Sequence, residues 1–142
     1  MNLPQAYVSR MRALLGAEFD AFLESMAEAG KSVADALGDR IIYINVMNRL
    51  SVDCDCDGNP AEPDMHDIGI LASADPVALD QACADAVLAQ PAMPNSVLFD
   101  RECACNEGDH FHRAHPDTHW QVCLEHAEKL GIGTRDYELI KI

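Results

Sequence analysis

The stretch Ile68-Gly69-Ile70-Leu71-Ala72-Ser73-Ala74-Asp75-Pro76 decides the expected fold, because it joins an apolar run to a helix start. The run at residues 68–72 is short, apolar and bounded by polar residues, which is typical of a buried strand. Asp75 suits the N-cap of a helix, and Pro76 suits its first position. A helix is therefore expected over residues 75–90, with Cys83 in the core on its apolar face.

The same alternation of strand and helix extends to both sides of this stretch. Ile41-Ile42-Tyr43-Ile44-Asn45-Val46 is rich in β-branched residues and predicts a buried strand. Further strands are expected at residues 137–142 and at Val97-Leu98-Phe99, and a helix at residues 117–130, capped by Asp117 and closed by Gly131. The pattern predicts an α/β fold with a layered sheet of three to four strands and flanking helices.

The N-terminal part has helical periodicity instead. Residues 4–15 and 17–29 both read as amphipathic helices, with Gly16 and Gly30 as the punctuation. The expected organisation is a helical segment over residues 1–30 and an α/β domain over residues 31–142.

Composition limits the function. The 142 residues carry 24 acidic and 10 basic side chains, a formal net charge of −14, which opposes nucleic-acid binding. No apolar stretch approaches the roughly 20 residues of a membrane span, and the first residues lack the pattern of a secretory signal. A cytoplasmic location is expected, where six cysteines serve as ligands or buried thiols rather than disulfides.

The densest chemistry lies in Asp53-Cys54-Asp55-Cys56-Asp57-Gly58. Residues two apart share a face of an extended chain, so Cys54 and Cys56 are able to bind one metal, with Asp53 or Asp57 as a further ligand. His66 lies beside this acidic segment as a supporting candidate. The alternative is a solvated acidic loop with idle thiols.

Two variants of this site remain open. Cys103 and Cys105 form a second Cys-x-Cys pair that would complete a four-thiolate site if the fold brought both pairs together. Calcium is a weaker option. The EF-hand pattern is matched at positions 1, 3, 5, 6 and 12 by Asp53, Asp55, Asp57, Gly58 and Asp64. However, Pro60 lies within the loop, Asp64 replaces the usual Glu, and the flanks read as a strand and a Pro-rich loop rather than helices.

A third cluster has helical spacing. His119, Cys123 and His126 line one stripe, as chelating residues would, but core packing with exposed histidines is favoured.

From about Met26 to Ile142 the chain resembles the C-terminal part of the uncharacterised Fe–S centre proteins, the family called domain of unknown function 362. The shared motifs are Ile44-Asn45-Val46, Asp53-Cys54-Asp55-Cys56, Asp67 to Ser73, Asp75 to Gln81, His115-Pro116, Leu130 to Gly133 and Tyr137 to Ile140. The resemblance implies iron–sulfur or redox chemistry. However, the chain has no Cys-x-x-Cys, so the usual [4Fe–4S] ligand pattern of ferredoxin modules is absent.

Residues 1–25 resemble a different family. Met1 to Arg10 and Leu14 to Phe22 look like the opening helices of Sun-type rRNA cytosine-5 methyltransferases. The chain lacks the length and pattern of their catalytic domain, so no methyltransferase activity is expected.

We expect the chain to be a domain that binds metal, either as an iron–sulfur cluster or as zinc. It would then take part in electron transfer with a redox or ferredoxin-like partner protein. The competing hypothesis is a structural remnant that oligomerises through exposed sheet surface and binds no metal. Homo-oligomers are expected in either case, and the sequence leaves open whether the chain is an enzyme.

Overall fold

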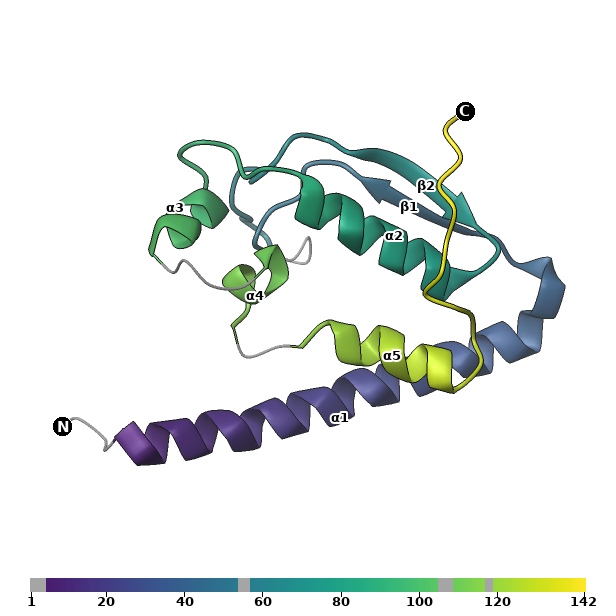
Figure 1. Cartoon of the computed structure of the whole chain (residues 1–142), viewed down its shortest axis with the longest axis horizontal. Coiled ribbons are helices and arrows are strands. Elements are labelled where there is room, and N and C mark those ends of the chain that lie inside the picture. The colour runs from purple at the N-terminus through teal and green to yellow at the C-terminus, as the bar shows by residue number, and fades with distance from the viewer. Residues whose placement is uncertain (1–4, 54–56, 105–108, 117–118) are drawn as a thin grey trace.

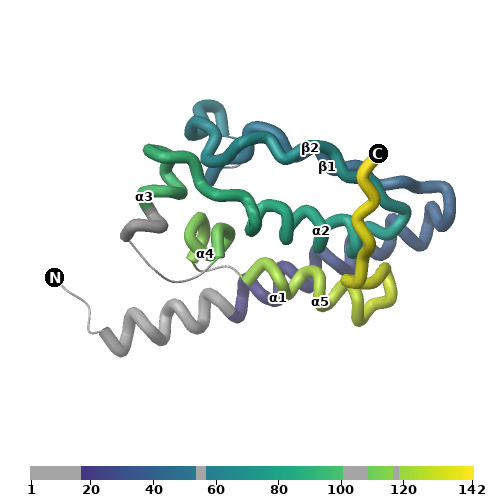
Figure 2. Tube along the Cα trace, turned by 45° about the horizontal axis from the view of Figure 1, so that its top comes forward, coloured from purple at the N-terminus to yellow at the C-terminus, as the bar shows by residue number. Residues whose placement is uncertain are grey.

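The elements of this protein lie in four layers, as a computed structural model shows (Figure 1). The structure describes residues 5–53, 57–104, 109–116 and 119–142, with side chains from residue 17 onwards except for residues 101–104. A sheet of β1 (Tyr43–Met47) and β2 (Gly69–Ser73) covers α2 (Pro76–Ala89), which packs on α5 (Gln121–Lys129), and α5 rests on α1 (Gln5–Leu37). Figure 2 shows the same order from a second direction.

The sheet formed by the described residues has two antiparallel strands. Val46 pairs with Ile70 and Ile44 with Ala72, so these side chains share one face of the sheet. The opposite face carries Met47, which is buried, and packs on α2. The sheet therefore has one covered and one uncovered face.

Helix α2 is apolar almost all the way round because it lies between the sheet and α5. Val77, Leu79 and Ala84 are all buried although they point in different directions on the helix. The helix begins as expected, with the Asp75 side chain accepting hydrogen bonds from the Val77 and Ala78 amides and Pro76 in the first turn.

Helices α1 and α5 pack through small residues and paired charges. Ala27 of α1 and Ala127 of α5 are buried in one cluster with Val77 and Leu124. Two short helices, α3 (Val97–Ala104) and α4 (His110–Ala114), and a 3-10 turn at Gly38–Arg40 complete the described elements. Among these elements, no helix is long and apolar enough to cross a membrane.

Several expectations hold. Strands β1 and β2 match the predicted strands at 41–47 and 68–72, and helices α2 and α5 match those at 75–90 and 117–130. Gly131 follows the end of α5 with a φ of 73°, the left-handed conformation of a helix C-cap. The predicted cap, Asp117, lies outside the described residues.

The sheet is smaller than predicted. Val97-Leu98-Phe99 is helical because Ser96 begins a helix there, accepting the Phe99 amide on its hydroxyl and the Asp100 amide on its carbonyl. The predicted strand at 137–142 is also wrong: within the described chain it pairs with no strand, and Tyr137 instead donates its hydroxyl to Asp85 on α2. The layered sheet of three to four strands is thus replaced by one antiparallel pair.

The two helices expected at residues 4–15 and 17–29 form one helix, without the break expected at Gly16, and residues 31–37 continue it after Gly30. Helix α1 continues through both glycines to Leu37, because packing on α5 outweighs a propensity loss of about 1 kcal/mol per glycine.

Candidate functional site

A buried carboxylate connects the segments that carry the two Cys-x-Cys pairs. Asp64 is 1% exposed, and its two oxygens accept the Val52 amide at 2.6 Å and the Leu98 amide at 2.7 Å. Its own backbone amide donates to the Leu50 carbonyl, and its carbonyl accepts the Met93 amide. Four hydrogen bonds thus fix the loop after β1 against the start of α3. Val52, Met65 and Leu98 pack around this group as an apolar cluster.

This junction lies close in sequence to the four predicted thiolates. Val52 precedes Cys54 by two residues, and Leu98 precedes Cys103 by five. Cys54, Cys56 and Cys105 lie outside the described residues; of Cys103, the structure gives the backbone position in α3. The metal-binding prediction for these cysteines therefore stays a prediction.

Three supporting candidates are described, and all three are exposed. One oxygen of Asp53 accepts the Ala61 amide at 2.8 Å, and one oxygen of Asp57 accepts the Asn59 amide at 2.8 Å. These carboxylates thus shape the loop, as Asp side chains often do in turns. The backbone carbonyl of His66 accepts a 3.4 Å hydrogen bond from the side-chain amide nitrogen of Gln90.

The position of Asp64 bears on the calcium alternative. A buried side chain turned towards the amides of Val52 and Leu98 is not the bidentate ligand that closes an EF-hand loop. Among the side chains that the structure describes, no group of three or more His, Cys, Asp or Glu is placed to hold a metal ion.

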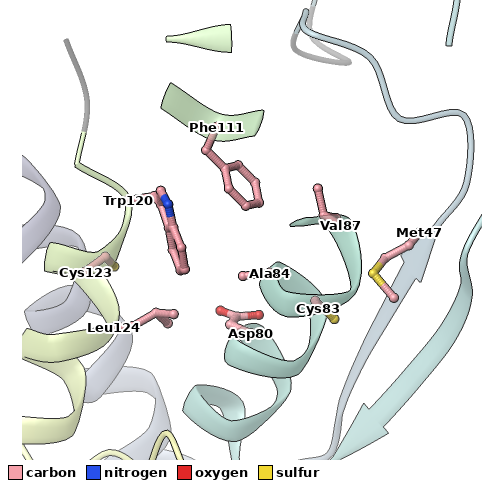
Figure 3. A pocket seen from close by; sticks show the side chains of 9 residues that line it. All are labelled: Met47, Asp80, Cys83, Ala84, Val87, Phe111, Trp120, Cys123 and Leu124. Carbon is pink, nitrogen blue, oxygen red and sulfur yellow. The ribbon is translucent and has the colours of Figure 1, made fainter. Parts of the chain in front are cut away.

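A second feature is a pocket of about 320 Å³ between α2, α4 and α5 (Figure 3). Its walls are apolar and aromatic, with Phe111 and Trp120 opposite Ala84 and Val87. Cys83 and Cys123 also line it, and Asp80 is the one charged side chain among the lining residues. The full set is Met47, Asp80, Cys83, Ala84, Val87, Phe111, Trp120, Cys123 and Leu124.

The two pocket thiols are held in the protonated form. Burial raises the pKa of Cys83, and the negative charge of Asp80 raises it further, while a hydrogen bond from Asn45 acts in the opposite direction. Burial and the charge of Asp80 also raise the pKa of Cys123. Both side chains therefore present neutral, weakly polar sulfur at neutral pH. Cys83 is half-buried on the pocket wall rather than fully in the core.

The histidines of α5 and its N-terminal flank face acidic residues of α1. His119 Nδ1 lies 2.9 Å from Asp20 Oδ1, and His126 Nε2 lies 3.4 Å from Glu28 Oε1. Cys123, between them in sequence, faces the pocket instead. The favoured interpretation of this stripe, packing and surface contacts rather than chelation, agrees with this arrangement.

Sequence reasoning missed both Asp64 and the pocket. In the sequence, Asp64 appears as one more acidic residue of the loop. Its neighbours Pro63 and Met65 are the one local difference, because Asp53, Asp55 and Asp57 alternate with cysteine or glycine. The pocket combines residues from β1, α2, α4, α5 and the N-terminal flank of α5, so no local sequence pattern predicts it.

Comparison with known proteins assigns the family. The family described as Domain of unknown function (DUF362) matches residues 4–85, which is more than half of the chain. The chain belongs to this family. The matched part contains α1, β1, β2, the Asp53–Gly58 segment and α2 as far as Asp85. Neither curated proteins nor solved structures gave a match.

The family match confirms the resemblance but places it differently along the chain. It begins at residue 4 rather than near Met26, and it ends before Cys103 and Cys105. Nothing in the comparisons bears on the resemblance of residues 1–25 to Sun-type methyltransferases.

Proposed function

We propose that this chain is a metal- or iron–sulfur-associated domain of its family that takes part in electron transfer with a redox protein partner. Cys54, Cys56, Cys103 and Cys105 would supply the thiolates. The observation that carries the proposal is the Asp64 junction, which ties the segments leading into both Cys-x-Cys pairs to one buried carboxylate.

The junction supports a shared site because the connecting lengths are short. Two residues of extended chain reach at most about 7 Å, so Cys54 stays near Val52. Five residues of helix rise about 7.5 Å, so Cys103 stays near Leu98. Both anchors, Val52 and Leu98, bond to the same side chain before any metal binds. This junction would reduce the entropy lost when the two Cys-x-Cys pairs come together around a metal.

The donor set fits the ligand class. Four thiolates hold either zinc or an iron–sulfur cluster, and a bound cluster would supply one-electron redox chemistry. Asp53, Asp57 and His66 stand on the exposed side of the same loop as supporting ligands or as charges that favour a cation. A net charge of −14 suits a partner with a basic docking face.

Metal content after anaerobic reconstitution with iron and sulfide, or with zinc, tests the proposal. Cys54→Ser/Cys56→Ser and Cys103→Ser/Cys105→Ser should each abolish most of the bound metal. Cys83→Ser/Cys123→Ser, a matched pair on the pocket wall, should retain it. Metal-free wild-type protein under all these conditions would refute the proposal.

A second candidate function, an oligomerisation domain without metal, is favoured by the uncovered sheet face. Ile42, Ile44, Val46 and Ile70 are between 58% and 68% exposed on it.

A further inference from the structure

We propose that the pocket between α2, α4 and α5 binds a small organic ammonium ion whose apolar part carries an aromatic ring or a branched chain. This site is separate from the cysteine segments of the proposed metal centre, and the proposal does not depend on that centre. The pocket lies within the described part of the chain, and its size falls at the lower end of the range for small-ligand sites.

The pocket walls favour a ligand with an apolar group. Met47, Val87 and Leu124 provide aliphatic surface, and the rings of Phe111 and Trp120 lie with centroids 5.1 Å apart. Figure 3 shows both rings directed towards the wall formed by α2. The Cys83 and Cys123 thiols stay protonated and add no charge. An apolar group would therefore replace water that has few polar partners in the pocket.

The aromatic wall is held in place before any ligand binds. The Trp120 indole nitrogen donates to Asp109 at 2.9 Å, and Asp109 also caps α4 by accepting the His112 amide. His110 of the same helix contacts the Gln90 carbonyl at 2.8 Å, which ties α4 to the end of α2. A prepositioned wall reduces the entropy lost on binding.

Asp80 supplies the charge that selects a cation. Asn45 donates to one carboxylate oxygen, Oδ1, at 2.9 Å and so orients the group. Asp80 is exposed, and among the described residues no protein group bonds to its other oxygen, Oδ2, which is therefore open to solvent and to a ligand. The influence of Asp80 reaches both Cys83 and Cys123, so its field extends across the pocket. Trp120 lines the same pocket, and the face of an aromatic ring attracts a cation that lies within about 6 Å of it.

Other ligand classes fit less well. Anions would face Asp80 and the overall charge of −14. The side chains of Asp80, Cys83 and Cys123 do not form a metal-binding group among the described residues. A neutral apolar molecule would contact the apolar walls of the pocket but would not interact with the charge of Asp80.

The sole tryptophan of the chain, Trp120, makes the test direct. Phenethylamine should change its fluorescence saturably and bind about fivefold more tightly than 2-phenylethanol, since an ion pair at a partly exposed rim adds only a modest gain. Ethylamine, which has the charge without the ring, should give no saturable change at the same concentrations.

Two substitutions separate the charge from the walls. Asp80→Asn should remove the preference for phenethylamine over 2-phenylethanol, whereas Asp85→Asn, the same change of charge on the same helix, should retain it. Ala84→Leu should weaken the binding of both probes at least fivefold, because the larger side chain fills the pocket. This variant tests the proposal even if Asp80→Asn fails to fold. Equal binding of amine and alcohol by the wild type, or no saturable change with phenethylamine, would overturn the proposal.

Discussion

Asp64 holds two distant segments together through a single side chain. Its carboxylate is fully buried, yet each oxygen accepts a backbone amide, so the desolvation of the charge is offset by two charge-assisted hydrogen bonds. An amide side chain at this position would turn one NH₂ group towards a backbone donor. The residue is therefore expected to be intolerant even of the isosteric change to Asn.

Asp64→Asn should lower the free energy of unfolding by about 2–4 kcal/mol, because one buried backbone amide loses its acceptor and meets a donor instead. Chemical denaturation measures this loss. Under the proposed function the same substitution should also reduce metal retention in the folded protein at low temperature.

Asp75→Ala provides the matched comparison. It removes the cap of α2 and the acceptor of the Thr134 amide, and should cost about 1–2 kcal/mol. The hydrogen bonds described for Asp75 go to Ser73, Thr134 and the first turn of α2, and none of them involves the Asp64 junction, so metal retention should be unchanged. Equal metal loss in both variants would mean that Asp64 acts through general stability alone.

Two glycines with equally open surroundings should respond in opposite ways to alanine. A Cβ at Gly30 or Gly38 would meet no atom within 4 Å, but Gly38 has a φ of 52° whereas Gly30 lies inside α1. Gly30→Ala should raise the free energy of unfolding by about 0.5–1 kcal/mol, and Gly38→Ala should lower it by a similar amount. Thermal or denaturant unfolding measures both, and a stabilised Gly38→Ala variant would contradict the helix boundary at Leu37.

The pocket thiols should make stability fall in alkaline solution. The folded state raises the pKa of Cys83 and Cys123, so their contribution is fully present below the ordinary thiol pKa of about 8.5. It is lost as pH rises through the raised values, where the unfolded chain releases these protons more readily. The unfolding temperature under reducing conditions should drop between pH 7.5 and 10, and should drop less in Cys83→Ala/Cys123→Ala. An identical drop in both proteins would exclude these thiols as the source.

At the scale of elements, the sequence predicts what local patterns control. Strands β1 and β2 and helix α2 follow from apolar runs and from the Asp75-Pro76 start, which the structure retains. The strand prediction at Val97-Leu98-Phe99 is wrong because the periodicity of so short an apolar run does not distinguish a strand from a helix. The hydrogen bond from the Phe99 amide to the Ser96 hydroxyl favours the helix. Residues 137–142 alternate like a strand, but contacts with α2 replace strand pairing.

The candidate metal site also has one part that local sequence patterns predict and one part that they do not. Residue types and spacing identify the Cys-x-Cys pairs, whereas the junction between Val52 and Leu98 depends on a tertiary contact across 34 residues, from Asp64 to Leu98. Such a contact leaves no local pattern. The pocket is equally hidden, because its lining spans residues 47 to 124.

At the scale of the whole molecule, the uncovered sheet face predicts self-association. Ile44→Lys/Val46→Lys should shift the protein towards monomer in sedimentation experiments by placing charges on that face. Ile140→Lys, at an even more exposed residue of the C-terminal segment, should not. Added salt should strengthen association of the wild type, because it screens repulsion between chains of charge −14. A wild type that stays monomeric at high concentration and high salt would contradict this.

The central proposal is that the two Cys-x-Cys pairs, whose flanking segments are joined at Asp64, share one metal site. X-ray absorption spectroscopy of the zinc-loaded protein tests it most directly, because every sulfur neighbour of zinc is a cysteine thiolate, whereas a cluster also contains sulfide. We predict four sulfur neighbours at about 2.3 Å from the zinc, and fewer in Cys103→Ser/Cys105→Ser. A metal with two or fewer sulfur neighbours in the wild type would contradict the shared site.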